Sequence, residues 1–201
     1  MSLRSIELTK IADPLPGSIP YDNHRPLNIP GRFDGQMLFD TVIELFPHIS
    51  RQQWEAWFDS GHILQNGAPV QPGRVVRGGE CFQHVFPDTV EPPVSTEIRW
   101  VWEDDCVVAL AKPSPLPVHP CGRFNRNTLG FFLDQIYGLG ALRLVHRLDA
   151  NTSGLMILAK TAQYATDLRK QFEASIVEKR YLARVMGHPL TESFHCDEPI
   201  G

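Results

Sequence analysis

The sequence predicts an α+β protein made of two small folded parts that follow a proline-rich arm. Between residues 31 and 90, apolar residues recur first at helical spacing and then in short strand-like runs around a turn. From about residue 98, apolar runs of strand length alternate with helical patterns, and Pro92-Pro93 separates the two regions. A chain of 201 residues can hold one domain with a sizeable core or two small ones.

These patterns divide the chain into three segments. Residues 1–30 contain five prolines and no periodicity, which favours an extended arm or a leader packed against the rest of the molecule. Residues 31–90 form a small module, and residues 91–201 form a second domain.

The small module reads as two helices followed by a hairpin. The first helix ends near Pro47 and is indicated by Met37, Leu38, Val42, Leu45 and Phe46. Ser50 is placed to cap a second helix, which ends at Gly61 and carries Trp54, Trp57 and Phe58. A short strand over residues 62–65 then leads into Asn66-Gly67, a hairpin turn signal.

The second domain begins with a continuous apolar run over residues 106–111, which predicts a strand buried on both faces. A helix is expected over residues 128–137, and a strand over residues 155–160. Thr161 is placed to cap a further helix that ends at about Ala174. Residues 179–187 alternate as a strand would, with Tyr181, Ala183 and Val185 on one face.

The composition is that of an ordinary soluble globular protein, with 42% hydrophobic and 21% charged residues. No run approaches the roughly 20 apolar residues that a membrane span requires. The first residues show neither a secretory apolar segment nor an amphipathic transit pattern, so a cytoplasmic location is expected.

The four cysteines are far apart and include no C-x-x-C pair, which argues against a disulfide framework and against a zinc site. His119 and Cys121 could supply two ligands, but no second pair accompanies them and structural zinc needs four. We therefore expect no metal.

Positive charge is concentrated in one stretch of a chain whose net charge is −4. Residues 141–190 hold eight Lys and Arg against four Asp and Glu, a net of +4, so the remainder carries −8. Such a patch suits an RNA-handling site, whereas a solvated helix and strand with scattered charge would give the same count.

The most informative motif is His146-Arg147-Leu148-Asp149, which leads through a small-residue turn at Thr152-Ser153-Gly154 into an apolar strand. Asp149 offers a nucleophile or base, and Arg147 offers a planar group that binds phosphates or bases. A polar turn that feeds a buried strand holds such groups in fixed positions.

This run, with the apolar strand ending at Ala159-Lys160, resembles the signature of the ribosomal- and transfer-RNA pseudouridine synthase family. Two further segments resemble family elements, namely Lys112-Pro113 through Val118-His119-Pro120, and Lys179 to Gly187. The resemblance implies a mixed, mostly antiparallel sheet and an enzyme that isomerises uridine in structured RNA to pseudouridine without a cofactor. It also implies that Asp149 is catalytic and that Tyr181 stacks on the target base.

Each candidate residue has a structural alternative. Asp149 could bond to its own turn as an Asx turn, and Arg147, instead of filling the gap left by a flipped base, could clamp a phosphate or form a surface salt bridge. His146 could assist Arg147 or be a structural histidine, and Tyr181 could be a core residue. Lys112, at a strand end, is expected to cap backbone carbonyls.

The helix–helix–hairpin segment resembles the small alpha-L RNA-binding module of ribosomal proteins, which some pseudouridine synthases carry at the N-terminus. Residues 31–90, however, hold four Arg and seven acidic residues, a net of −3, whereas that module has a basic helical face. Arg51 alone lies where the basic helix would contact RNA, so a small packing or spacer domain is the alternative.

The family continues beyond the kind of segment formed here by Pro199-Ile200-Gly201, through strands that supply further basic residues. We therefore expect a truncated catalytic domain, and little activity from the 201-residue form. The alternative function is a non-catalytic RNA-binding protein with a relic synthase domain. A glycosidase-like hydrolase is less favoured, because no second carboxylate accompanies Asp149 in the motif. The choice between transfer RNA and ribosomal RNA, and the oligomeric state, stay open.

Overall fold

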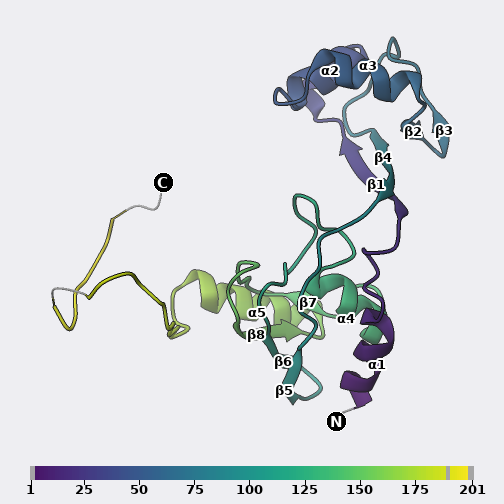
Figure 1. Ribbon diagram of the computed structural model, residues 1–201. Helices are drawn as coiled ribbons and strands as arrows, with labels where there is room; N and C mark the ends of the chain where they lie inside the picture. The colour runs from purple at the N-terminus through teal and green to yellow at the C-terminus, as the bar shows by residue number, and fades with distance from the viewer. Residues whose placement is uncertain (1–2, 189–190, 199–201) are drawn as a thin grey trace.

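The structure is a computed structural model that describes residues 3–188 and 191–198. It contains two antiparallel sheets of four strands each, connected through residues 90–98 (Figure 1). This arrangement agrees with the predicted α+β class. The segment Pro199-Ile200-Gly201, to which the expected truncation refers, lies outside the described residues.

The first sheet and its two helices form a unit that we term the N-terminal module, residues 21–89. Its strand order is β1-β4-β2-β3. The elements are β1 (Tyr21–Asn28), a 3-10 turn (Gly31–Phe33), α2 (Leu38–Leu45), α3 (Arg51–Asp59), β2 (Ile63–Gln65), β3 (Ala68–Pro69) and β4 (Cys81–Thr89).

The local signals of this module act as predicted. Ser50 Oγ accepts a hydrogen bond of 3.2 Å from the backbone N–H of Gln53, which caps α3. Asn66 and Gly67 adopt φ of 52° and 79°, the left-handed conformation that a tight β2–β3 hairpin requires. The core combines aliphatic side chains with four buried aromatic rings, Phe33, Trp54, Phe58 and Phe82. The two predicted helices and the hairpin are confirmed as elements.

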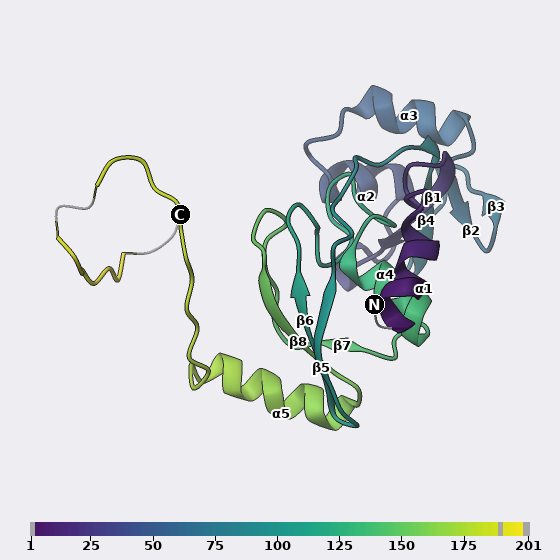
Figure 2. The same ribbon diagram turned by 60° about the horizontal axis from the view of Figure 1, so that its bottom comes forward.

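Residues 1–30, expected to be an extended arm or a leader packed against the rest of the molecule, contain two elements. Helix α1 (Leu3–Ala12) packs beside α4 (Leu129–Tyr137) in the other half of the molecule (Figures 1 and 2). Strand β1 pairs with β4 along its length, so a prediction based on the absence of periodicity misses it. Pro26 is accommodated within β1, which lies at the edge of the sheet order.

The second sheet and its helices form the C-terminal half, residues 98–173, with strand order β5-β6-β8-β7. Its elements are β5 (Arg99–Glu103), β6 (Val107–Lys112), α4, β7 (Arg143–Leu144), β8 (Gly154–Ala159) and α5 (Ala162–Glu173). Thr128 and Thr161 cap α4 and α5 through their side-chain oxygens, as Thr161 was predicted to do.

The two faces of this sheet are covered differently. Met156 and Leu158 of β8 pack in an aliphatic core with α4 and α1. Ile157 and Ala159 instead pack with α5 on the opposite face. Residues of β6 alternate between buried and half-buried, so the prediction of a strand buried on both faces holds for one face only. The physical reason is that α4 and α1 cover one face continuously, whereas α5 covers the other next to β8 and β7.

One predicted element is wrong within the described residues, namely the strand over residues 179–187. This segment has no regular structure and leaves α5 as an extended stretch (Figure 1). A strand needs a neighbour to satisfy its backbone groups, and none of the described strands pairs with it. Among the helices of the described residues, none is long and apolar enough to cross a membrane.

Candidate active site

The motif residues 146–153 form the turn between β7 and β8, at the edge of the C-terminal sheet. Strand β8 pairs with β6 along its whole length and with β7 only at its end, so the pairing of Gly154 with Lys112 fixes its start. The backbone N–H of Thr152 donates to the carbonyl of Asp149 at 3.1 Å and closes the turn. The Asp149 side chain is exposed there, and Ser153 is the last residue of the turn before β8.

Lys112, at the end of β6, holds this turn in place through hydrogen bonds. It is 1% exposed, and its ammonium group donates to the carbonyls of Pro113 at 2.9 Å, Leu116 at 2.8 Å and Ala150 at 3.3 Å. The Ala150 carbonyl also accepts from the backbone N–H of Leu116 at 2.9 Å. The expectation that Lys112 caps backbone carbonyls is confirmed, and the result is that the proline-rich loop and the motif turn are joined next to Asp149.

Burial lowers the pKa of Lys112, while the negative charge of Asp149 acts in the opposite direction. A buried ammonium group is tolerated because its three donors all find carbonyl acceptors. The two charges therefore belong to one electrostatic unit, in which Lys112 is fixed and Asp149 faces solvent.

A pocket of about 440 Å³ adjoins this unit. It is lined by Glu97, Arg99, Ala111, Lys112, Pro113, Ser153 and Gly154. Asp149 is not among its lining residues, and lies on the turn that leads into its Ser153 edge. Sequence reasoning missed Glu97 and Arg99, because nothing in the motif indicates that the strand next to β6 borders this space.

His146 is held in place by two contacts, one with β8 and one with α5. Its Nε2 accepts a hydrogen bond of 3.1 Å from the backbone N–H of Ile157, and its ring stacks on Phe172 of α5 with centroids 4.5 Å apart. Burial, followed by the charge of Lys179, lowers the pKa of His146. These contacts favour the structural alternative for His146, because an imidazole that accepts from a backbone N–H is neutral at that nitrogen.

Arg147 precedes Asp149 by two residues and is exposed. Within residues 3–188 and 191–198, its guanidinium makes no hydrogen bond, ion pair or ring contact. The surface salt bridge considered as an alternative is therefore absent from the described part of the chain. Its donors are available to a ligand, together with the Asp149 carboxylate.

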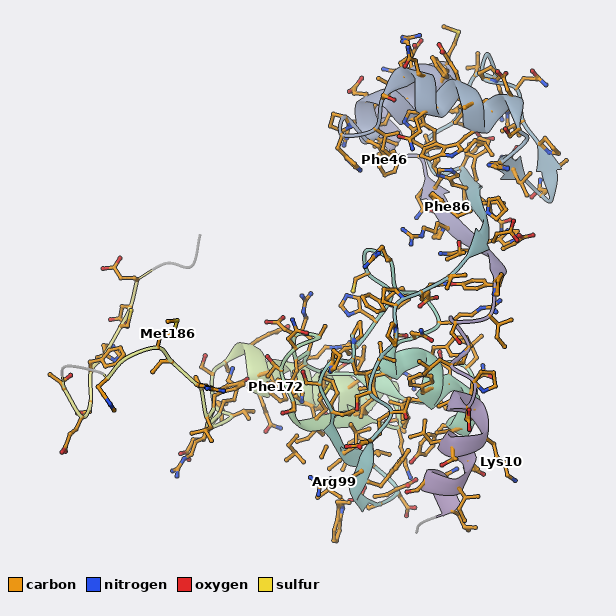
Figure 3. The ribbon with its side chains drawn as sticks, in the orientation of Figure 1. Lys10, Phe46, Phe86, Arg99, Phe172 and Met186 are labelled. Atoms are coloured by element: carbon orange, nitrogen blue, oxygen red, sulfur yellow. The ribbon has the colours of Figure 1, made fainter. Side chains whose placement is uncertain are left out.

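Tyr181 is not brought to this turn. It lies beyond α5 in the extended segment and is 68% exposed. Figure 3 shows the course of that segment: Phe172 lies at the end of α5, and Met186 lies well away from the sheet. The position also excludes a core tyrosine in this structure, so the role of Tyr181 stays a prediction.

Arg51 lies on α3 of the N-terminal module, far from the motif turn (Figure 1). Its guanidinium is 4.0 Å from the carboxylate of Asp40 and lies over the ring of Phe39 at 4.9 Å. It borders a pocket of about 450 Å³ that Asp40, Glu55 and Asp59 also line. The surroundings of Arg51 are acidic, which does not suit a phosphate ligand.

Metal ligands do not gather in the part of the chain that the structure describes. No group of three or more His, Cys, Asp or Glu residues is close enough to hold an ion there. The four cysteines are free.

An exposed carboxylate and an unpaired guanidinium on one turn beside a pocket can contact a polar substrate, and arginine suits phosphate groups in particular. Residues 106–201 match the sequence profile of the family described as RNA pseudouridylate synthase. This match places residues 106–201 of the chain in that family.

Curated relatives carry names of the same kind. Pseudouridylate synthase RPUSD2 of Homo sapiens is 38% identical over 171 residues, which cover 85% of this chain and 31% of the relative. Ribosomal large subunit pseudouridine synthase D of Xanthomonas campestris is 37% identical, over 81% of this chain and 51% of the relative. The mitochondrial tRNA pseudouridine(32) synthase of Saccharomyces cerevisiae is 33% identical, over 80% of this chain and 35% of the relative.

The chain thus spans about a third to a half of the length of these relatives. A solved structure of Human RNA Pseudouridylate Synthase Domain Containing 4 is 32% identical and covers 38% of this chain and 30% of that chain. Its TM-score of 0.31 is too low to bear on the fold.

Proposed function

We propose that this chain carries the catalytic turn of an enzyme that isomerises uridine in structured RNA to pseudouridine, with Asp149 as the catalytic carboxylate. The anchored turn carries this proposal: it exposes Asp149 and an unpaired Arg147 within the residues that match the family. The substrate is transfer RNA or ribosomal RNA, since relatives named for each are similar to this chain.

The reaction explains why a carboxylate is needed. Pseudouridine forms when the glycosidic carbon–nitrogen bond breaks, the uracil turns, and the base rejoins the sugar through ring carbon five. Carbon five then loses its hydrogen as a proton, and the released ring nitrogen takes up a proton, so the reaction is an isomerisation. Cleavage leaves an electron-poor sugar, which a nearby carboxylate stabilises or traps. Attack on the anomeric carbon and removal of a sugar proton both require an accessible oxygen, and the exposed side chain of Asp149 supplies one. No step changes an oxidation state overall, so the proposal includes no cofactor.

Arg147 has a mechanical part in this proposal. A uridine leaves its stack before it reaches the carboxylate, and unstacking costs a few kcal/mol. The planar guanidinium of Arg147, unpaired in the described structure, can stack in the vacated place and contact a phosphate. Tyr181 would complete the site by stacking on the flipped base.

The second candidate is a non-catalytic RNA-binding protein. The position of Tyr181 favours it, because the ring is 68% exposed beyond α5 instead of lying over the motif turn. The basic stretch around the motif would then bind RNA without chemistry, and Asp149 would be dispensable.

Three further expectations stay predictions. They are the cytoplasmic location, the three-segment division of the chain and the alpha-L-like role of residues 31–90.

Tritium release tests the proposal. RNA labelled at carbon five of uracil is incubated with the chain, with Asp149→Asn, and with Asp105→Asn as a matched exposed carboxylate in the same half. We expect the weak release given by the 201-residue form to fall to background in Asp149→Asn, with RNA binding retained and with release by Asp105→Asn unchanged. Equal release by wild type and Asp149→Asn would contradict the catalytic role. RNA binding without release by any form would favour the second candidate, and robust release would contradict the expectation of a weakly active chain.

A further inference from the structure

A buried carboxylate joins the two halves of the molecule at a place that the proposed mechanism does not use. Glu91 follows β4 and is 3% exposed. Its Oε2 accepts from the backbone N–H groups of Asn125 at 2.9 Å and Asn127 at 2.8 Å, and its Oε1 accepts from that of Arg126 at 2.8 Å. The Tyr21 hydroxyl of β1 also donates to Oε1. One side chain thus fixes three successive peptide groups of the loop before α4.

A second set of bonds surrounds this carboxylate. Asn127 Oδ1 accepts from the backbone N–H of Gly17 at 2.9 Å, and Asn127 Nδ2 donates to the carbonyl of Pro92 at 2.9 Å. The backbone N–H of Glu91 donates to the Gly17 carbonyl at 2.8 Å. A Cβ atom on Gly17 would lie 2.6 Å from Glu91 Cδ, so the packing leaves no room for a side chain there.

The charge state of Glu91 is consistent with a permanent structural anion. Burial acts to raise its pKa, but the peptide N–H groups of residues 125–127 and the Tyr21 hydroxyl together lower it. Charge-assisted bonds of this kind are about twice as strong as neutral ones, and they offset the cost of burial. Burial, followed by the bond to Glu91, raises the pKa of Tyr21 to about 12, so the hydroxyl stays a donor.

The loop held in this way, residues 121–127, also touches β1 through two arginines. Arg25 donates to the carbonyl of Gly122 at 2.7 Å, and the guanidinium of Arg126 lies 3.6 Å from the ring centroid of Tyr21. Arg123 is exposed on the same loop. The negative charge of Glu91 is bonded to peptide N–H groups and a hydroxyl instead of to an arginine. The junction therefore carries three arginines that form no ion pair with it, the exposed Arg123 and the half-buried Arg25 and Arg126. By contrast, Arg51 on α3 is paired with Asp40.

Two backbone hydrogen bonds connect the region after this junction to the motif turn. The backbone N–H of Leu129, at the start of α4, donates to the carbonyl of Pro117 at 2.8 Å. Leu116, one residue earlier, donates to Ala150 in the motif turn. Hydrogen bonds thus connect the start of α4, which follows the loop 121–127, to the motif turn by way of residues 116 and 117.

We propose that Glu91 is a positioning residue that locks the N-terminal module to the loop 121–127, so that both halves bind the phosphates of one structured RNA as a single surface. The proposal rests on the proposed function and adds to it a preference for a large folded RNA, such as a full transfer RNA, over a short stem-loop. The module contributes through its junction with the loop instead of through α3.

The test compares Glu91→Gln and the milder Tyr21→Phe with Asp22→Asn, which removes an exposed carboxylate on the same strand as Tyr21. Circular dichroism first establishes that each variant is folded. Hydrogen exchange of the amides of residues 125–127 should become at least about tenfold faster in Glu91→Gln, by less in Tyr21→Phe, and should not change in Asp22→Asn.

Kinetics and binding then test the effect on RNA, with a full transfer-RNA transcript and a stem-loop cut from it. We expect Glu91→Gln to raise KM and Kd for the full transcript about tenfold, with kcat and the values for the stem-loop within twofold of wild type. Unchanged exchange in Glu91→Gln, or an equal loss for both RNAs, would overturn the proposal. The exchange rates and Kd values decide the role of Glu91 independently of turnover. A failure of this proposal is therefore distinguishable from a failure of the proposed function, which the comparison of wild type with Asp149→Asn decides.

Discussion

The two halves of the molecule treat buried polar groups differently. In the N-terminal module, aromatic rings join the aliphatic core, and Trp54, Trp57, His84 and Phe86 form a continuous cluster. Among the described residues, the four buried side-chain nitrogens without a hydrogen-bond partner all lie in this half, on Asn23, Trp54, His62 and His84. The C-terminal half has an aliphatic core, and its buried Lys112 is fully bonded.

The difference shows what each core does. The aromatic cluster stabilises the module through area and ring packing, and its polar nitrogens are incidental to that. In the C-terminal half, the buried polar group holds a loop and the motif turn together, so its bonds are tied to the geometry of the site. We therefore expect substitutions in the two halves to differ in kind, with structural loss in the module and loss of site geometry near β6 and β8.

Lys112→Met should give the largest effect. It fills a similar volume but leaves the carbonyls of Pro113, Leu116 and Ala150 with fewer donors in a buried place. We expect the free energy of unfolding of the C-terminal half to fall by about 4 kcal/mol. Urea unfolding measures the loss. Lys160→Met is the control, because Lys160 forms a partly exposed ion pair with Glu103 and should cost less than about 1 kcal/mol. Equal losses in the two variants would contradict the anchoring role of Lys112.

Acid should destabilise the module next most strongly, through His84. Burial, then the charges of His62 and Arg25, lower its pKa from 6.5 to about 4. Because the folded pKa is depressed, the unfolded chain binds the proton first, and stability falls as the pH decreases from about 6.5 to 4. The total loss is about 3 kcal/mol.

The measurement is the free energy of unfolding at a series of pH values, for wild type and His84→Phe. The phenylalanine keeps a ring between Trp57 and Phe86 and removes the titrating group. The difference between the two proteins should change over this pH range and stay constant above it. A difference that is independent of pH would show that His84 does not titrate as the structure implies.

RNA affinity provides the third comparison, between one arginine in each half. Arg147 has no partner in the described structure, whereas Arg51 contacts Asp40 and Phe39. We expect Arg147→Gln to weaken RNA binding about tenfold, which is about 1.4 kcal/mol, and Arg51→Gln to weaken it less than twofold. Filter binding at one fixed salt concentration measures both. A larger loss from Arg51→Gln would return the RNA-binding role to α3.

Much of the fold could be predicted because its signals are local. Ser50 and Thr161 cap the helices that follow them, and Asn66-Gly67 makes the turn that its residue types require. Strand β1 was missed because its pairing partner is β4, about 60 residues later, and its own sequence has no alternation to reveal it. The strand over residues 179–187 was predicted from alternation alone, which does not supply a neighbour.

The site shows the same limit. The turn with Asp149 and Arg147 is a contiguous motif, so its sequence is sufficient to find it. The role of Glu91 could not be found in this way. Its three peptide donors lie more than 30 residues away, and a single glutamate between a strand and two prolines has no distinctive pattern. Groups that act through tertiary contacts with backbone N–H groups leave no signal in residue types.

The smallest predicted effect is a loss of stability from a substitution at Gly67 in the N-terminal module. Gly67 has φ of 79°, in the left-handed region, and a Cβ there would meet no atom within 4 Å. Gly67→Ala therefore adds backbone strain without a clash, and should lower the free energy of unfolding of the module by about 1 kcal/mol. Gly73→Ala is the matched control, because its site is equally open and its φ is not left-handed. Thermal unfolding should show a lower Tm for Gly67→Ala and an unchanged or higher Tm for Gly73→Ala.

Since the turn at Gly67 is far from the motif and contributes only to the module, RNA turnover should be the same in both variants. A loss of turnover in Gly67→Ala would mean that local strain in the module reaches the motif turn, and the two halves would then be coupled more tightly than the junction at Glu91 implies.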